Sequence, residues 1–147
     1  MKISTKGRYG TRAMLELSLR YGEGPIMVHE IAESQGISVR YLEQILNTLR
    51  TSGLVISTRG AKGGYELYKP PSDITVGDII RALEGPFDVV PCTGEYDCER
   101  MGKCVTFQVW KEVKEAIENV LDSVTMKELA ERKSKLINND ELIEYII

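Results

Sequence analysis

Two short amphipathic stretches joined by a three-residue turn are the feature that most constrains the fold of this 147-residue chain. Residues 28–35 predict the first helix, and the second begins after Ser38 and ends near Ser52-Gly53. Its apolar stripe consists of Val39, Leu42, Ile45, Leu46 and Leu49. In the turn, Gly36 suits the left-handed residue that ends a helix, and Ser38 suits the N-cap of the next one. The pattern predicts a helix-turn-helix, whose second helix offers its free face to the DNA major groove.

A glycine-rich hairpin follows this pair of helices. Residues 54–58 and 65–68 predict two short strands. The connecting loop contains Gly60, Gly63 and Gly64, which permit a tight turn and a close approach to a DNA backbone. The loop also carries the cations Arg59 and Lys62 at its tip, where they could reach phosphates or a narrow minor groove. The fold class we expect is therefore mainly α with a small β-hairpin wing, a winged helix-turn-helix.

The polar face of the second helix carries side chains of the kinds that read base pairs. Arginine suits guanine, glutamine suits adenine, and glutamate can accept a hydrogen bond from cytosine. Cations on or near a first helix at 6–21, Lys6 and Arg12 among them, could add phosphate contacts. The DNA-binding residues we expect are Ser38, Arg40, Tyr41, Glu43, Gln44, Arg59, Gly60, Lys62, Gly63 and Lys6. For any one of them the alternative is a solvated surface role, and for Tyr41 a place in the core.

The charge distribution agrees with an anionic partner for the first half of the chain. Residues 1–70 hold 10 Lys and Arg against 6 Asp and Glu, whereas residues 71–147 hold 9 against 16. The net charge of −3 hides this asymmetry. No run of about 18 apolar residues is present, and the N-terminus lacks the apolar stretch of a signal peptide, so we expect no membrane span and a cytoplasmic location.

The remainder of the chain divides into a loop and further helices. We expect a winged helix-turn-helix domain at 1–84, a cysteine-bearing loop at 85–104, and helices at 105–147. The longest helical pattern covers about 105–123 and has two adjacent apolar stripes, which can serve both its own domain and a partner helix. A capping box at Thr125 and Glu128 predicts a short helix, and residues 136–147 predict a further one.

The three cysteines of the chain all lie in the long loop. Cys92, Cys98 and Cys104 follow a C-x5-C-x5-C spacing. Reduced thiolates close together in a loop can wrap a metal or cluster, but this spacing does not suit the common zinc sites. Three thiolates leave one coordination position to another group, which suits a labile, sensing site. The alternatives are three unconnected thiols or a redox disulfide.

These motifs together resemble a family of bacterial winged-helix regulators that includes IscR, NsrR, RirA and CymR. The resemblance covers about residues 1–133 and is strongest to the IscR-like regulators of iron–sulfur cluster assembly. Its carriers are Lys6-Gly7-Arg8-Tyr9, residues 37–46, Leu49-Arg50, Gly53-Leu54-Val55, the wing 59–65, the cysteines, and Lys103-Cys104-Val105-Thr106.

The resemblance implies a homodimer on double-stranded DNA and a metal site at Cys92, Cys98 and Cys104. It implies that the helix near 105–123 pairs across the two-fold axis, through Val109, Val113, Ala116 and Val120. It implies an iron–sulfur cluster, 2Fe–2S in preference to 4Fe–4S, whose occupancy changes which DNA sites are bound. Cluster-assembly scaffold proteins are further partners that it suggests.

One position departs from the IscR pattern. That pattern has a histidine as fourth cluster ligand three residues after the last cysteine, where this chain has Phe107. The fourth ligand therefore stays open among an acidic residue of the loop, Glu43 or another group of the partner chain, a water, or a small thiol.

The sequence thus predicts a DNA-binding transcription regulator and not an enzyme. The single histidine, His29, lies in the DNA-binding part, so a hydrolytic triad has no base near a cysteine nucleophile, and no phosphate-binding loop motif is present. Glu43, an anion on the reading face, is our candidate for discrimination between DNA sites. The runner-up function is a regulator of the same fold that responds to nitric oxide, iron or thiols, with a 4Fe–4S cluster or none.

Overall fold

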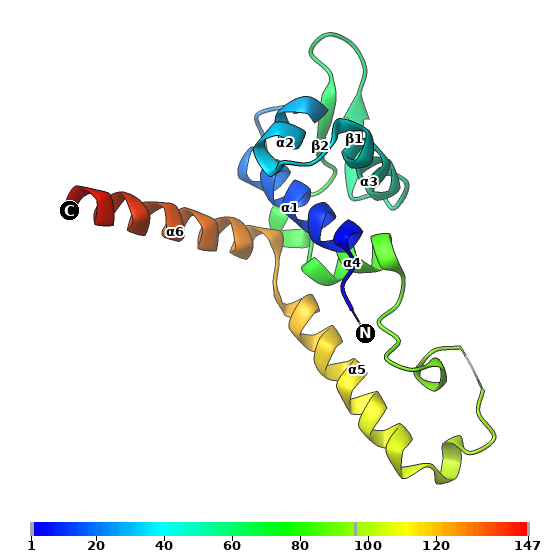
Figure 1. Ribbon diagram of the computed structural model, residues 1–147. Helices are drawn as coiled ribbons and strands as arrows, with labels where there is room; N and C mark the ends of the chain where they lie inside the picture. The colour runs from blue at the N-terminus through cyan, green and yellow to red at the C-terminus, as the bar shows by residue number, and fades with distance from the viewer. Residues whose placement is uncertain (1, 96, 147) are drawn as a thin grey trace.

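The computed structural model describes residues 2–95 and 97–146, with side chains up to residue 140. The elements of this part are α1 (Thr5–Leu19), α2 (Val28–Gln35), α3 (Val39–Thr51), β1 (Val55–Thr58), β2 (Gly64–Leu67), α4 (Val76–Glu84), α5 (Val105–Ser123) and α6 (Met126–Ile146). Short 3₁₀ turns lie at Pro71–Asp73, Pro91–Thr93 and Met101–Lys103. The body packs around α1, and α5 and α6 extend from it in different directions (Figure 1). The prediction of a mainly helical chain with a small hairpin wing is confirmed.

Local capping sets the helix boundaries around the helix-turn-helix. Gly36 ends α2 in the left-handed conformation, at φ 63°, which glycine adopts without a Cβ penalty. The Ser38 hydroxyl then accepts a hydrogen bond from the Tyr41 amide at 3.2 Å, as an N-cap does. Further along, Thr75 and Asp78 form a reciprocal capping box that starts α4.

The core lies where α1, α3 and α4 meet. Met14, Ile45 and Ile79 are among its fully buried side chains. Gly10 allows a close approach of α1 to α4, because a Cβ there would lie 2.2 Å from the Leu83 Cδ1 atom in its present position. Met126 is fully buried in the same cluster, so the first turn of α6 is part of this core.

The wing is a short antiparallel pair with Val55 opposite Leu67 and Thr58 opposite Gly64. Leu67 and Val55 are buried and fix the base of the hairpin on the core. A bridge between Ile26 and Tyr65 adds a further backbone contact on the other side of β2. The turn residues 59–62 extend into solvent beyond these anchors.

The C-terminal segment differs from the sequence prediction. Residues 126–146 form one continuous helix, so the expected division into a short helix and a second one at 136–147 was wrong; residue 147 lies outside the described part. The apolar pattern lapses after Ala130 because α6 leaves the core there, and not because the helix ends. Beyond that point, strong helix formers and the ion pair of Arg132 with Glu128, at 2.6 Å, stabilise the helix. In the described residues, no helix has the length and apolar character needed to cross a membrane.

Candidate nucleic-acid interface and cysteine loop

Helix α3 has one buried and one exposed face, as the reading-helix hypothesis requires. Its buried residues are Leu42, Ile45, Leu46 and Leu49. Arg40, Glu43 and Gln44 are exposed on the other face. Val39, which the sequence assigned to the apolar stripe, is 40% exposed, because it lies in the first turn, ahead of the point where α3 meets the core.

Two of the expected contact residues in α3 also have internal roles. The Ser38 hydroxyl is exposed and serves the N-cap described above. Tyr41 is half-buried, and its ring meets the ring of Tyr9 edge-on, with centroids 6.0 Å apart. The structure therefore gives Tyr41 a packing partner in α1.

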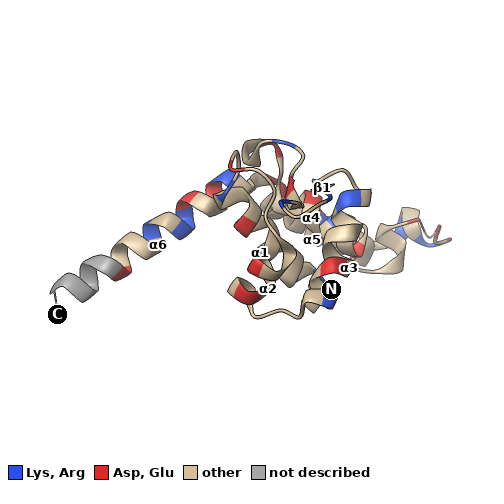
Figure 2. Cartoon of the chain, turned by 90° about the horizontal axis from the view of Figure 1, so that it is seen from above, with Lys and Arg blue, Asp and Glu red and all other residues tan. Residues whose placement is uncertain are grey.

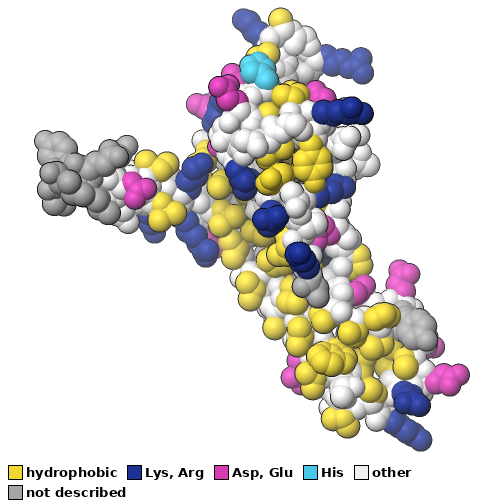
Figure 3. Space-filling model, in the orientation of Figure 1, with side chains coloured by type: hydrophobic (Ala, Val, Ile, Leu, Met, Phe, Trp, Pro, Cys, Tyr) yellow, Lys and Arg dark blue, Asp and Glu magenta, His cyan; other side chains and the backbone are white. Residues whose placement is uncertain are grey.

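The wing presents its cations at the tip. Arg59, Gly60 and Lys62 are exposed, and Figure 3 shows basic side chains projecting from this end of the molecule. Gly63 is buried, and a side chain there would clash, because a Cβ would lie 2.1 Å from the Thr58 carbonyl oxygen. Its role in the structure is to close the turn.

Arg50 at the end of α3 braces the wing, a link that sequence reasoning missed. Its guanidinium donates to the Asn47 side chain at 2.6 Å and to the Ser57 hydroxyl of β1 at 3.2 Å. The position of Arg50 in the last turn of the helix was visible in the sequence, but its partner across the turn was not. The contact fixes the hairpin relative to α3.

Two cations of α1 are accessible to solvent, whereas a third, Arg12, is hydrogen-bonded to α2. Lys6 is half-exposed and Arg8 is exposed, and Arg8 also donates to the Thr5 hydroxyl at 3.1 Å. The guanidinium of Arg12, by contrast, donates to the Gln35 side chain at 2.8 Å and to the Gln35 carbonyl at 2.7 Å. Arg12 thus closes the end of α2, so the expected phosphate contact would have to compete with two hydrogen bonds.

The three cysteines are free and half-buried. Cys92 lies in η2 (Pro91–Thr93), Cys98 in the loop that follows, and Cys104 at the N-cap of α5. Among the described residues, no three His, Cys, Asp or Glu side chains are grouped closely enough to hold a metal ion. The loop therefore carries thiol donors of the kind that bind iron–sulfur clusters. The three thiols do not lie close together in this structure.

The environment of Cys104 favours the thiolate form of its side chain. The Thr106 hydroxyl lies 3.1 Å from its sulfur, and donation from this hydroxyl lowers the pKa of the Cys104 thiol, helped by the Phe107 amide and the positive charge of Arg100. A lowered pKa favours the thiolate, which is the form that binds metals and reacts with electrophiles. Phe107 itself is half-buried and offers no ligand atom.

A lysine joins the loop segment around Cys92 to the middle of α5. Lys114 pairs with Asp88 at 2.8 Å and donates to the Thr93 carbonyl at 3.0 Å. Both ionised side chains are largely covered, at 22% and 28% exposed. Cys92 and Phe107 line one hollow of about 310 Å³ beside this pair. Sequence reasoning missed Asp88 and Lys114, because their pairing joins residues 26 apart.

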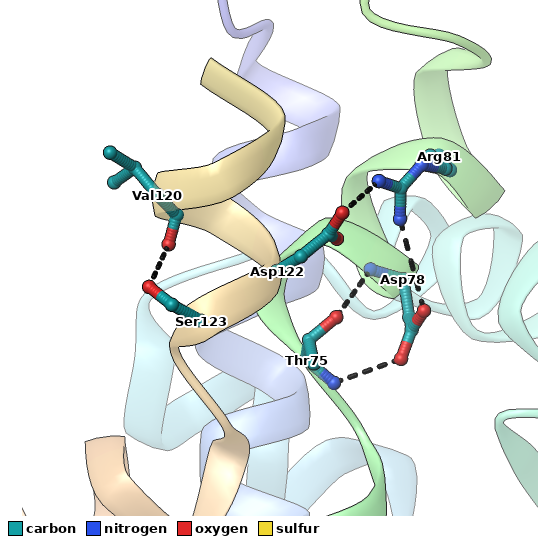
Figure 4. A network of polar contacts seen from close by, with 6 residues as sticks. All are labelled: Thr75, Asp78, Arg81, Val120, Asp122 and Ser123. Carbon is teal, nitrogen blue, oxygen red and sulfur yellow. Dashed lines mark hydrogen bonds and ion pairs between the residues drawn. The ribbon is translucent and has the colours of Figure 1, made fainter. Parts of the chain in front are cut away.

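A polar junction connects the winged-helix core to α5. Arg81 of α4 binds Asp122 at 2.5 Å and lies 3.9 Å from Asp78, and Figure 4 shows these groups facing one another. The hydrogen bond that Arg81 donates to Asp122 raises the pKa of Arg81 further above its ordinary value. The Arg81 guanidinium also lies 4.8 Å from the centroid of the buried Phe87 ring, at the start of the cysteine loop.

Helix α5 has an apolar face that the other described residues leave uncovered. Val109 is 48% exposed, Val113 38% and Val120 62%. An open groove of about 530 Å³ runs along it, and Figure 3 shows apolar side chains gathered over this lower part of the molecule. The groove is lined by Ile3, Val113, Ala116, Ile117, Val120 and Leu121.

The fold, the exposed face of α3 and the wing define the class as a winged helix-turn-helix protein with a cysteine-bearing loop. A family model described as Rrf2, an iron-dependent transcriptional regulator, matches residues 3–132. The chain belongs to the Rrf2 family, a family of transcriptional regulators and not of enzymes.

Named relatives and solved structures agree with this family. The chain is 40% identical to the HTH-type transcriptional regulator IscR of Serratia proteamaculans, over 95% of this chain and 88% of that protein. The structure of T. potens IscR has a TM-score of 0.74 and 47% identity, over 90% of this chain and 88% of that one. The structure of CymR, titled the global cysteine regulator of B. subtilis, has a TM-score of 0.75 and 44% identity, over 90% and 98%.

Proposed function

We propose that this protein is a dimeric, sequence-specific transcription regulator that senses iron–sulfur cluster status and controls genes for cluster assembly. The observation that supports the sensing part is the set of three free thiols on one loop. The first buried residue of that loop, Phe87, contacts Arg81, which joins α4 to α5. Changes in that loop can thus reach the DNA-binding part through packed side chains. Since its partner is DNA, we place its action in the cytoplasm.

DNA recognition would use two surfaces of the winged-helix domain. Arg40, Glu43 and Gln44 on the exposed face of α3 would meet base edges in the major groove. Arg59 and Lys62 at the wing tip would contact phosphates, with Lys6 as a further cation near the start of α1. Ser38 and Tyr41 would support the reading helix, and Gly60 and Gly63 would shape the wing turn.

Dimerisation would use the uncovered face of α5. The exposed positions Val109, Val113, Ala116 and Val120 recur at helical spacing and form a stripe along the helix. A second copy of the same face is complementary by symmetry, and burying both stripes removes the apolar area from water. Two DNA-binding domains would then meet two half-sites on one duplex.

Cys92, Cys98 and Cys104 would hold the cluster, 2Fe–2S in preference to 4Fe–4S, and scaffold proteins would deliver it. When bound, the cluster would supply a covalent link between loop segments that are separate in the free chain. Lys114 holds the Cys92 segment on α5, Thr106 favours the thiolate of Cys104, and Phe107 leaves the fourth ligand to another group. With their thiolates bound, the three cysteines would order the loop and so set the position of the DNA-binding domains.

A second function rests on Cys104 alone. Its lowered thiol pKa favours reaction with oxidants and small disulfides, so a regulator of the same fold without a cluster would sense thiol status through this residue. The likeness to a structure titled as a cysteine regulator supports the same alternative.

Native mass spectrometry of protein purified without oxygen tests these proposals. A mass of 2Fe–2S per chain above the apo dimer is the expected result. A mass of 4Fe–4S per chain would favour a regulator of the same fold that responds to nitric oxide or iron through that cluster. An apo dimer despite cluster supply would favour the thiol sensor, and a monomer under the same conditions would contradict the α5 interface.

A further inference from the structure

Helix α1 turns three side chains toward the helix-turn-helix. Tyr9, Arg12 and Glu16 are spaced three and four residues apart and therefore lie on one side of the helix. Their partners lie in the last two residues of α2 and in the first turn of α3, on either side of the turn at residues 36–38. This turn sets the angle between α2 and the exposed face of α3.

Gln35, the last residue of α2, forms hydrogen bonds to α1 through both the oxygen and the nitrogen of its side-chain amide. Its Oε1 accepts from Arg12 at 2.8 Å, and its Nε2 donates to the Glu16 carboxylate at 2.6 Å. Glu16 also accepts from the Ser34 hydroxyl at 2.8 Å. Hydrogen bonds to ionised groups are stronger than neutral ones, so the end of α2 is firmly attached to α1.

The same stripe reaches the first turn of α3. The Arg12 guanidinium lies 5.5 Å from the centroid of the Tyr9 ring. The Tyr9 ring in turn packs edge-on against Tyr41, with an angle of 72° between the ring planes. One helix face thus holds both sides of the turn.

Glu16 also faces the C-terminal helix. The Lys133 ammonium of α6 lies 3.6 Å from Glu16 Oε1, the same oxygen that accepts from Ser34 and Gln35. The Glu16 side chain is 17% exposed, and Lys133 is 35% exposed. Charged side chains of both signs recur along α6, which extends from the body past this contact (Figure 2). Glu16 therefore connects α6 with the end of α2.

We propose that Glu16 is a positioning residue for DNA recognition, which fixes the angle of α3 through Gln35, and that Lys133 makes this position sensitive to α6. The inference rests on the DNA-binding part of the proposed function and is independent of the cluster. It predicts that a change at Glu16 or Lys133 alters discrimination between DNA sequences, although neither residue is on the reading face.

The sign of the effect separates positioning from simple electrostatics. Removing an anion from a DNA-binding domain should raise affinity for any duplex, because phosphate repulsion falls. If Glu16 positions α3, Glu16→Ala instead lowers affinity for the preferred sequence. Glu16→Gln keeps an acceptor for Ser34 and Gln35 and should restore part of the loss.

The experiment uses the full chain and a duplex selected by the wild type from a random-sequence pool. We measure affinity for that duplex and for a scrambled duplex of equal composition. Glu16→Ala should lower the ratio of the two affinities at least about fivefold without weakening scrambled binding, and the exposed Glu33→Ala should leave the ratio unchanged. An unchanged ratio for Glu16→Ala, or equal losses on both duplexes, would overturn the positioning role.

Lys133→Met tests the link to α6 without removing a buried group. Lys135→Met, on the same helix and exposed, is the matched control for charge. Lys133→Met should lower the ratio about twofold to threefold, Lys133→Arg should retain it, and Lys135→Met should leave it unchanged. Equal behaviour of the two Met variants would overturn the α6 link. A wild type that selects no sequence would contradict the proposed function itself.

Discussion

Arg81 and Asp122 join the helix that closes the winged-helix core to the end of the long helix α5, with 2.5 Å between guanidinium and carboxylate. Two backbone hydrogen bonds flank this pair. The Val76 amide donates to the Val124 carbonyl at 2.9 Å, and the Met126 amide donates to the Ile74 carbonyl at 2.8 Å. Gly77 lets Asp122 approach, because a Cβ there would overlap its carboxylate. The base of α5 is thus a fixed joint.

Replacing Arg81 by Met should lower the free energy of unfolding by about 1 kcal/mol, since the partly exposed ion pair and the contact with Phe87 each contribute a fraction of that. Urea unfolding measures the change. Arg132→Met is the matched control, because it removes an exposed pair within α6 and should cost only about 0.3 kcal/mol. Equal losses in the two variants would contradict a joint at Arg81.

The joint also shows what the sequence could not predict. The N-cap of α6 at Thr125 was readable because Thr125 and its partner Glu128 lie within one helical turn. Arg81 and Asp122 are 41 residues apart, and their pairing exists only once α4 and α5 are packed. Likewise, the bounds of α2 and α5 follow from local periodicity, whereas the length of α6 depends on where it leaves the core. The cysteine spacing indicated a donor set but not the positions of the thiols in space.

Thr106→Val should slow alkylation of Cys104 near neutral pH. The Thr106 hydroxyl lowers the pKa of the Cys104 thiol, so removing it raises that pKa and reduces the thiolate fraction. The difference should disappear at a pH above both pKa values, where the thiol is ionised in either protein. Iodoacetamide rates from peptide mass spectrometry of the metal-free protein measure it, with Cys98 as internal control. A pH-independent difference would indicate an altered access to Cys104 instead.

Val120→Asp should dissociate the dimer. The substitution places a charge in the apolar groove of α5, and burying an unpaired carboxylate costs several kcal/mol, enough for at least a tenfold rise in the dimer dissociation constant. Asn119→Asp adds the same charge to an exposed neighbour outside the groove lining and is the control. Sedimentation velocity over a concentration series measures the dimer dissociation constant. An unchanged constant for Val120→Asp would show that this face of α5 is not the dimer interface.

Arg59→Ala should weaken DNA binding at least several-fold at physiological salt, because the exposed wing-tip cation would contact a phosphate. The slope of log affinity against log salt should fall by about 1, equally for preferred and scrambled duplexes. Lys127→Ala removes an exposed cation from α6 and should leave the slope unchanged. An unaffected affinity of the Arg59 variant would exclude the wing from the interface.

Glu43→Ala should change the choice between DNA sites more than the affinity for any one of them. Glu43 is exposed on the face of α3 beside Gln44, and a carboxylate there repels phosphates unless a cytosine amino group meets it. The variant should therefore bind a broader set of sequences, and sites lacking that cytosine should gain about 1–3 kcal/mol relative to the preferred one. Selection from a random-sequence pool compares the wild type with the variant. Glu33→Ala, on α2, controls for the lost charge, and identical preferences of the Glu43 variant and the wild type would exclude this role.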